Sequence, residues 1–187
     1  DWGEGVRGIE GDAATSYFGV FPHLILNQKE SFVFKGRNRR PPKDAVNAML
    51  SFVYTLISND VTAALETVGL DPYVGFMHAL RPGRPSLALD IMEELRAYLG
   101  DRLVLSLINR KQITGNQFLQ QGDESIIMTD DARRTIISAW QARKKEQIQH
   151  PFLNEKVSIG LLPHIQAMML ARYLRNDLDD YPVFLIQ

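Results

Sequence analysis

Apolar residues recur three and four positions apart over most of the 187-residue chain, with short polar stretches between these regions. This spacing places them on one face of an α-helix. The pattern predicts helices at residues 4–27, 44–68, 85–96, 102–109, 129–149 and 163–176. We expect the second of these, the longest apolar helix, to be the central packing helix of the fold.

Helix-breaking and capping residues set the boundaries of that long helix. The loop at 28–42 ends in Pro41 and Pro42, which do not continue a helix. Asp44 then offers an N-cap, and Gly69 ends the helix. The boundaries are therefore predicted from local chemistry as well as from periodicity.

Residues 113–128 have a different pattern, with β-branched residues on either side of a Gly-Asp turn, which predicts a small β-hairpin. In the helix that follows we expect Ile136, Ile137 and Trp140 to face inward, and in the last helix Met168 and Met169 to pack in the core. The expected fold is all-α, mainly helical: a single domain over residues 1–187 with one small hairpin near 113–128.

Composition excludes several classes of protein. The chain is 45% hydrophobic, which is enough for a buried core. Without cysteine it has no disulfide or thiolate metal site, which is typical of the cytoplasm. No apolar run approaches the roughly 20 residues of a membrane span and no secretory leader is present, so no membrane role is expected. Because the chain starts at Asp1 and is helical almost at once, we expect a fragment of a longer protein.

A net charge of −1 argues against a generally basic nucleic-acid binder, but the cations are clustered. The clusters are Lys35, Arg37, Arg39, Arg40 and Lys43; Arg81 and Arg84; and Arg133, Arg134, Arg143, Lys144 and Lys145. For each cluster alone, a solvated surface is the simplest interpretation. Three clusters beside one acidic pocket would favour contact with a phosphate backbone.

The candidate chemistry lies between residues 69 and 96. His78 precedes a helix that carries Asp90, Glu93 and Glu94 at helical spacing. Taken alone, these acids are typical of a solvated helix face. A loop histidine and a helical carboxylate could instead hold a divalent metal if the chain supplies a third ligand. Ser86 stands at the start of this helix, where a capping role is expected rather than a nucleophilic one.

Three stretches, in order along the chain, resemble the CRISPR-associated integrase and endonuclease family, the metal-dependent DNA enzymes of spacer acquisition. They are Arg7-Gly8-Ile9-Glu10-Gly11 with Tyr17-Phe18; residues 39–44 with 47–52; and residues 69–78 with 84–90. Residues 148–182 also look like the C-terminal end of subtype I-C members. The resemblance implies the C-terminal catalytic domain only, with the family's N-terminal β-rich dimerisation domain absent.

The family binds one divalent ion through a glutamate, a histidine and a further acid. The resemblance places these roles on Glu10, His78 and Glu93, with Asp90 as the alternative third ligand. Oxygen ligands favour Mg²⁺ or Mn²⁺, and an imidazole shifts the preference toward Mn²⁺. His78 has a second interpretation, as a proton donor or acceptor.

The implied reaction is attack of a spacer DNA 3′-hydroxyl on a phosphodiester of the repeat, which gives strand transfer; with water as the nucleophile it gives nicking. The implied partners are double-stranded and branched DNA and the small second CRISPR-associated protein, with a homodimer in full-length members. The alternative is a non-catalytic DNA-binding or assembly module whose acids cap helices.

Cations near the metal are the expected contacts for DNA phosphates. The predicted DNA-binding residues are Arg39, Arg40, Lys43, Arg81 and Arg84. The alternative for these cations is structural pairing with Asp44, Asp71 or Asp90.

Overall fold

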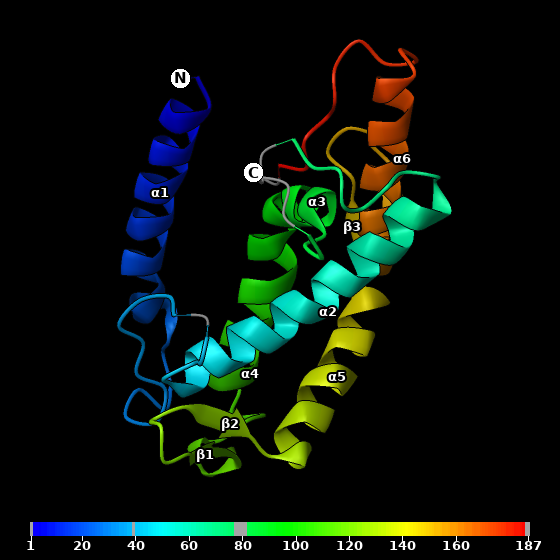
Figure 1. Ribbon diagram of the computed structural model, residues 1–187. Helices are drawn as coiled ribbons and strands as arrows, with labels where there is room; N and C mark the ends of the chain where they lie inside the picture. The colour runs from blue at the N-terminus through cyan, green and yellow to red at the C-terminus, as the bar shows by residue number, and fades with distance from the viewer. Residues whose placement is uncertain (1, 39, 77–81, 186–187) are drawn as a thin grey trace. The chain divides into compact units, whose positions relative to one another are not determined.

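The computed structural model describes residues 2–38, 40–76 and 82–185, and only the backbone of residues 2–10. As predicted, the chain is mainly helical (Figure 1). The helices are α1 (Trp2–Val20), α2 (Ala45–Thr67), α3 (Ser86–Arg96), α4 (Arg102–Asn109), α5 (Asp130–Lys144) and α6 (Leu162–Leu174). Short helical turns are η1 (Phe21–Leu24), η2 (Ala97–Asp101), η3 (Gly115–Gln117) and η4 (Ile159–Leu161).

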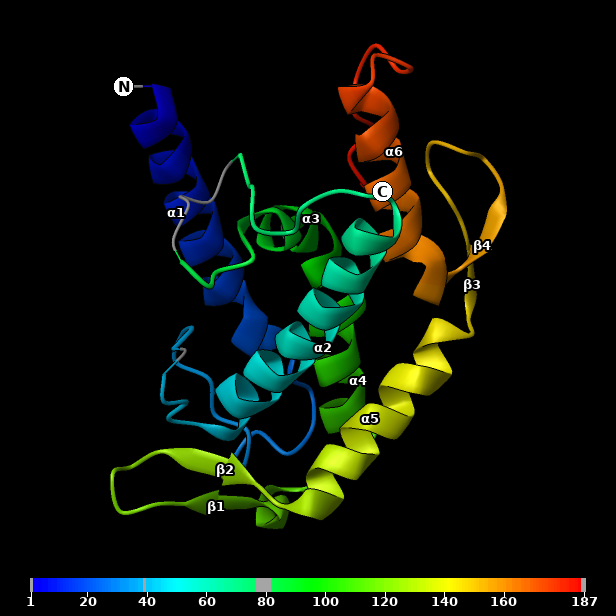
Figure 2. The ribbon, with the colours of Figure 1, turned by 45° about the vertical axis from the view of Figure 1, so that its right-hand side comes forward.

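Four short strands form two antiparallel pairs. β1 (Phe118–Gln120) pairs with β2 (Ile126–Met128), which confirms the predicted hairpin. β3 (Gln147–Gln149) pairs with β4 (Lys156–Ser158), between α5 and α6 in the chain (Figure 2). This second pair was not predicted.

The chain divides into two compact units, Asp1–Val53 with Leu103–Ser138 and Tyr54–Arg102 with Ala139–Gln187. The single domain expected over residues 1–187 stays a prediction. Because each unit is assembled from two separate stretches of chain, its packing depends on contacts between residues far apart in sequence.

In the first unit, the polar loop after η1 is fixed to the end of α4. The Asn109 side chain accepts a hydrogen bond from the Leu26 N–H at 2.8 Å, and the Gln28 side chain donates to the Ile108 carbonyl at 2.9 Å. The start of α2 is capped as predicted, since the Asp44 carboxylate accepts the Asn47 N–H at 2.7 Å. These bonds satisfy backbone groups that a loop would otherwise leave to water.

In the second unit, α3 packs against α6, and Arg96 at the end of α3 lies over the Tyr54 ring of α2. Buried residues line these helices, namely Ile57, Val61, Leu65, Leu87, Ile91, Leu95, Leu99, Ile165, Met169 and Leu170. An ion pair at 2.9 Å joins Lys144 at the end of α5 to Asp60 of α2. The acid-bearing helix is therefore held on its apolar side, as its spacing predicted.

The predicted helix at 129–149 is too long by five residues. α5 ends at Lys144, and the N–H groups of Lys145 and Glu146 bond to carbonyls only three residues back. The following backbone bonds to β4 instead of continuing the helix, and the Ile159 N–H closes this ladder on the Glu146 carbonyl at 2.8 Å. A non-local partner thus decides the end of the helix.

Three inward-facing or capping assignments were also wrong. Ile137 is 41% exposed and Met168 is 40% exposed, because each lies one position outside the buried arc of its helix. Pro85, not Ser86, occupies the N-cap of α3, and the buried Ser86 hydroxyl donates to the Arg84 carbonyl at 3.5 Å.

By length and composition, α2 is apolar enough to cross a membrane, contrary to the sequence expectation that no run approaches a span. Half of its most apolar window is buried inside the protein. A core helix that packs along much of its surface has this composition too.

Candidate metal and DNA site

Of the three metal ligands implied by the resemblance, only Glu93 has a described side chain. Glu10 lies within α1, as expected, but the structure describes only its backbone. His78, Arg39 and Arg81 lie entirely outside the described residues. Among the side chains that are described, no group of three histidine or acidic residues could hold a metal. Convergence of Glu10, His78 and Glu93 therefore stays a prediction.

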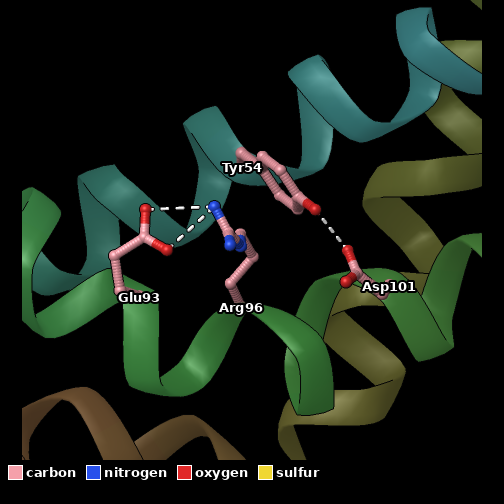
Figure 3. Close-up of polar contacts among 4 residues, drawn as sticks. All are labelled: Tyr54, Glu93, Arg96 and Asp101. Carbon is pink, nitrogen blue, oxygen red and sulfur yellow. Dashed lines mark hydrogen bonds and ion pairs between the residues drawn. The ribbon is translucent and has the colours of Figure 1, made fainter. Parts of the chain in front are cut away.

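Glu93 is partly exposed and paired with a cation one turn later on α3. Its carboxylate lies 2.8 Å and 3.0 Å from Nη1 of Arg96, with 21% of the Glu93 side chain exposed (Figure 3). The Glu93 carboxylate is thus held beside a cation and is partly accessible from solvent. These are the properties that an oxygen ligand for a hard cation requires.

Arg96 is oriented by an aromatic ring from α2. Its guanidinium carbon lies 5.6 Å from the centre of the Tyr54 ring, and the Tyr54 hydroxyl donates a hydrogen bond to the buried carboxylate of Asp101 (Figure 3). A Cβ added to Gly100 would lie 3.0 Å from Ile57 and 3.1 Å from the Tyr54 ring, so the π-turn η2 packs closely against α2 at this contact. The sequence did not predict this arrangement of Tyr54, Arg96 and Asp101, although Arg96 stands three residues after Glu93.

Asp90 is buried and holds the loop that leads toward His78. Its Oδ2 accepts the Phe76 N–H at 2.8 Å, and the Pro72 carbonyl accepts the N–H groups at the start of α3. A Cβ on Gly75 would lie 2.7 Å from Ser86 and 2.8 Å from Asp90. The chain therefore enters the segment at 77–81 directly beside Asp90.

Glu94 is surrounded by hydrogen-bond donors from α6 and from the C-terminal segment. Its carboxylate accepts the Phe184 N–H at 2.7 Å, the Gln166 amide at 3.0 Å and the Tyr181 hydroxyl. Burial raises the pKa of Glu94, and these three hydrogen bonds oppose that rise. Burial, then the Glu94 charge, raises the pKa of Tyr181. The solvated-face interpretation is thus wrong for Asp90 and Glu94.

The described cations of the predicted DNA surface are not paired with the acids proposed as their structural partners. Arg40 and Lys43 are exposed and Arg84 is partly buried, and none of them makes an ion pair within the described ranges. Asp44 bonds to Asn47, and Asp71 accepts the Tyr73 N–H at 2.9 Å. Arg40 and Lys43 are therefore accessible from solvent, and no ion pair within the described ranges competes for these three cations.

Residues 1–142 match the family model described as CRISPR associated protein Cas1. The chain is 58% identical to the CRISPR-associated endonuclease Cas1 1 of Chlorobaculum tepidum over 96% of this chain and 52% of that protein. It is 52% identical to the CRISPR-associated endonuclease Cas1 of Leptospira interrogans, over 97% of this chain and 71% of that protein. It thus spans about half the length of several curated relatives that it matches.

A solved structure agrees with these sequence matches. A chain of the Cas6-RT-Cas1–Cas2 complex superposes with a TM-score of 0.83 at 28% identity, over 97% of this chain and 20% of that one. The helical architecture is therefore shared with a known Cas1-containing protein. The match over residues 1–142, together with these relatives, shows that the chain belongs to the CRISPR-associated Cas1 family.

Proposed function

We propose that this chain is the C-terminal catalytic part of a metal-dependent DNA integrase and endonuclease of CRISPR adaptation, of subtype I-C character. The observation that carries the proposal is the family match over residues 1–142, with a charged, accessible Glu93 held by Arg96 at the expected position. The reaction is attack of a spacer 3′-hydroxyl on a phosphodiester of the repeat, or nicking when water attacks.

Glu10, His78 and Glu93 would hold Mg²⁺ or Mn²⁺. The chemistry of this donor set, two carboxylates and one imidazole, fits either ion. When bound, the ion polarises a phosphoryl oxygen and lowers the pKa of the attacking hydroxyl. Asp90 is less suited to ligation, because its buried Oδ2 is already bonded to the Phe76 N–H.

The remaining residues act on the substrate and on the ligands. Arg96 holds the Glu93 carboxylate in one orientation, which limits its rotamers before a metal binds. Arg40, Lys43 and Arg84, together with Arg39 and Arg81, bind DNA phosphates and keep the strand at the site. His78 completes the ligand set or moves a proton at the reacting oxygen.

The assembly partners follow from the relatives. The solved complex contains Cas1 with Cas2, which supports the small second CRISPR-associated protein as a partner of this chain in the cytoplasm. Longer relatives have the additional length for a dimerisation domain. We propose that the full protein works as a homodimer on double-stranded and branched DNA.

A nicking assay on branched DNA with Mn²⁺ tests the proposal. We expect Glu93→Ala to lower the rate by at least about 100-fold, since ligand loss exceeds the 10–100-fold cost of losing an outer-shell partner. Glu155→Ala, at an exposed glutamate, is the matched control and should retain the wild-type rate. Mn²⁺-dependent nicking that Glu93→Ala leaves unchanged would show that the proposed site is wrong.

A further inference from the structure

The C-terminal segment is fixed to α3 although it has no regular secondary structure. Three groups between Tyr181 and Phe184 converge on Glu94 and Gln166. The Tyr181 hydroxyl and the Phe184 N–H donate to Glu94, and the Pro182 carbonyl accepts from the Gln166 amide at 3.1 Å. The Phe184 ring is buried between Tyr98 and His150, with ring centres 5.9 Å and 5.7 Å away.

Gln166 and His150 fix the orientation of this network. The His150 Nδ1 accepts the Phe152 and Leu153 N–H groups, so the proton of a neutral ring lies on Nε2. That Nε2 lies 3.1 Å from the Gln166 Oε1, which directs the Gln166 amide nitrogen toward Glu94 and the C-terminal segment. Both Gln166 and His150 are fully or almost fully buried, so these bonds are sheltered from water.

Glu94, the residue that receives the C-terminal segment, directly follows Glu93 in the sequence. Asp90, four residues before Glu94, is tied to the loop through Phe76, and Glu94 is tied to the C-terminal segment through Phe184. Glu93 thus stands between two fixed positions on α3. If the segment left, Glu94 would lose two of its three donors, the Tyr181 hydroxyl and the Phe184 N–H. Because a partly buried carboxylate with fewer donors is unfavourable, the segment stabilises the observed position of Glu94 on α3.

Resting on the proposed function, we propose that residues 181–184 form a strap that positions Glu93, with Glu94 as its receiving residue. Glu94, Gln166 and Tyr181 are positioning residues that act through α3. The strap lowers the mobility of the metal-bearing turn before metal and DNA bind. The full catalytic geometry therefore depends on the far C-terminal end of the chain.

Two variants and two controls on the whole chain test the strap. Tyr181→Phe removes one hydroxyl, and Glu94→Gln removes the charge but keeps the shape. Leu185→Ala and Val183→Ala, at exposed positions in the same segment, are the controls. The measurements are amide hydrogen exchange of residues 86–96 without metal, Mn²⁺ affinity by electron paramagnetic resonance, and kcat and KM for nicking of DNA.

We expect both positioning variants to speed exchange in α3 and to weaken Mn²⁺ binding by about 10-fold, the lower range for an outer-shell partner. KM for DNA should stay unchanged, and the double variant should be no weaker than the worse single variant. Both controls should match the wild type. If Glu94→Gln does not fold, Tyr181→Phe carries the test alone.

Wild-type Mn²⁺ affinity in both variants, with or without faster exchange, would overturn the strap as a positioning device. A wild-type chain that binds no Mn²⁺ would contradict the proposed function itself, and the strap would fall with it. The two outcomes are distinguishable, because in the first the wild type and both variants bind Mn²⁺ equally, and in the second the wild type binds no Mn²⁺. Weaker Mn²⁺ binding in the controls as well would show a general effect of changing the segment and would also overturn the proposal.

Discussion

Three acids within five residues of one helix have three different environments. Asp90 is buried on a loop amide, Glu93 is partly exposed beside Arg96, and Glu94 receives the C-terminal segment. Glu93 combines partial exposure with an ion pair to Arg96. The environment of each carboxylate, rather than its spacing, separates a candidate ligand from two structural residues.

These environments predict that Asp90→Ala mainly lowers stability, whereas Glu93→Ala mainly lowers metal binding. Asp90→Ala leaves the Phe76 N–H without its acceptor and should cost about 1–3 kcal/mol of unfolding free energy in urea titrations. Glu93→Ala breaks a partly exposed pair and should cost about 0–1 kcal/mol, while abolishing Mn²⁺ binding. A larger stability loss from Glu93→Ala than from Asp90→Ala would reverse the two assignments.

A second prediction at this scale concerns the turn between β1 and β2. The Ser125 hydroxyl and then the Ser125 N–H lower the pKa of Asp123 below its ordinary 3.8. The bonds therefore contribute to stability above pH 3.8 and are lost as the pH falls through the lower folded-state pKa. Carboxyl-carbon NMR titration should show this low midpoint, and Ser125→Ala should return it toward 3.8. An unchanged midpoint in Ser125→Ala would refute this cause.

At the scale of elements, the site depends on the close seating of a loop on α3. The loop lies so near that glycine is needed at Gly75, where any Cβ would meet Ser86 and Asp90. This contact and the hydrogen bond from the Phe76 N–H to Asp90 hold residues 75 and 76 against α3. The loop and the helix should therefore respond together to a substitution at the contact.

Gly75→Ala should displace the loop, lower stability by about 1–3 kcal/mol through overpacking, and reduce Mn²⁺-dependent nicking. Gly19→Ala, in α1 with open space around its Cβ, should instead stabilise by about 0.5–1 kcal/mol. Thermal or urea unfolding of the two variants measures the contrast. Equal stability changes of the same sign would contradict the close seating.

Elements with local signals were predictable from the sequence. The cap at Asp44, the turn at Gly122 and the apolar spacing of α4 each act within a few residues, and α2, the first hairpin and α4 are where they were expected. The β3–β4 pair was missed because each strand is three residues long with a single apolar residue, Ile148 or Val157, and so short an alternation does not stand out in the sequence. The end of α5 was misplaced for the same reason.

The candidate site was predicted less completely. Glu93 could be found from the motif, because motif matching requires no tertiary contact. The partners of Glu94 lie 72 to 90 positions away, and no local pattern connects them. The ring of Tyr54 against Arg96 likewise depends on how α2 crosses α3.

At the scale of the whole molecule, a net charge of −1 does not describe how the cations are distributed, since several of them are clustered in the sequence. Arg40 and Lys43 in the first unit and Arg84 in the second make no ion pair in the described part of the chain. Overall charge is therefore a poor guide to DNA binding for this chain. Salt dependence is the more direct measure.

Alanine at Arg40, Lys43 or Arg84 should each weaken DNA binding about equally for all sequences. Each should also reduce the slope of log K against log salt by about 0.9. Fluorescence anisotropy at several salt concentrations measures this slope, with Lys29→Ala, in an exposed turn outside the basic clusters, as the control. An unchanged slope in all three variants would remove these residues from the DNA contact.

The π-turn η2 has a consequence for the buried side of α3. Buried residues recur every fourth position, at Leu87, Ile91, Leu95 and Leu99. In an uninterrupted α-helix this repeat would rotate by about 40° at each step, or about 120° in all. One additional residue within η2 returns about 100° of that rotation. The number of residues in η2 thus keeps Leu99 on the buried side that Leu87, Ile91 and Leu95 share, and deleting one residue before Leu99 would turn its side chain through more than a quarter of a circle.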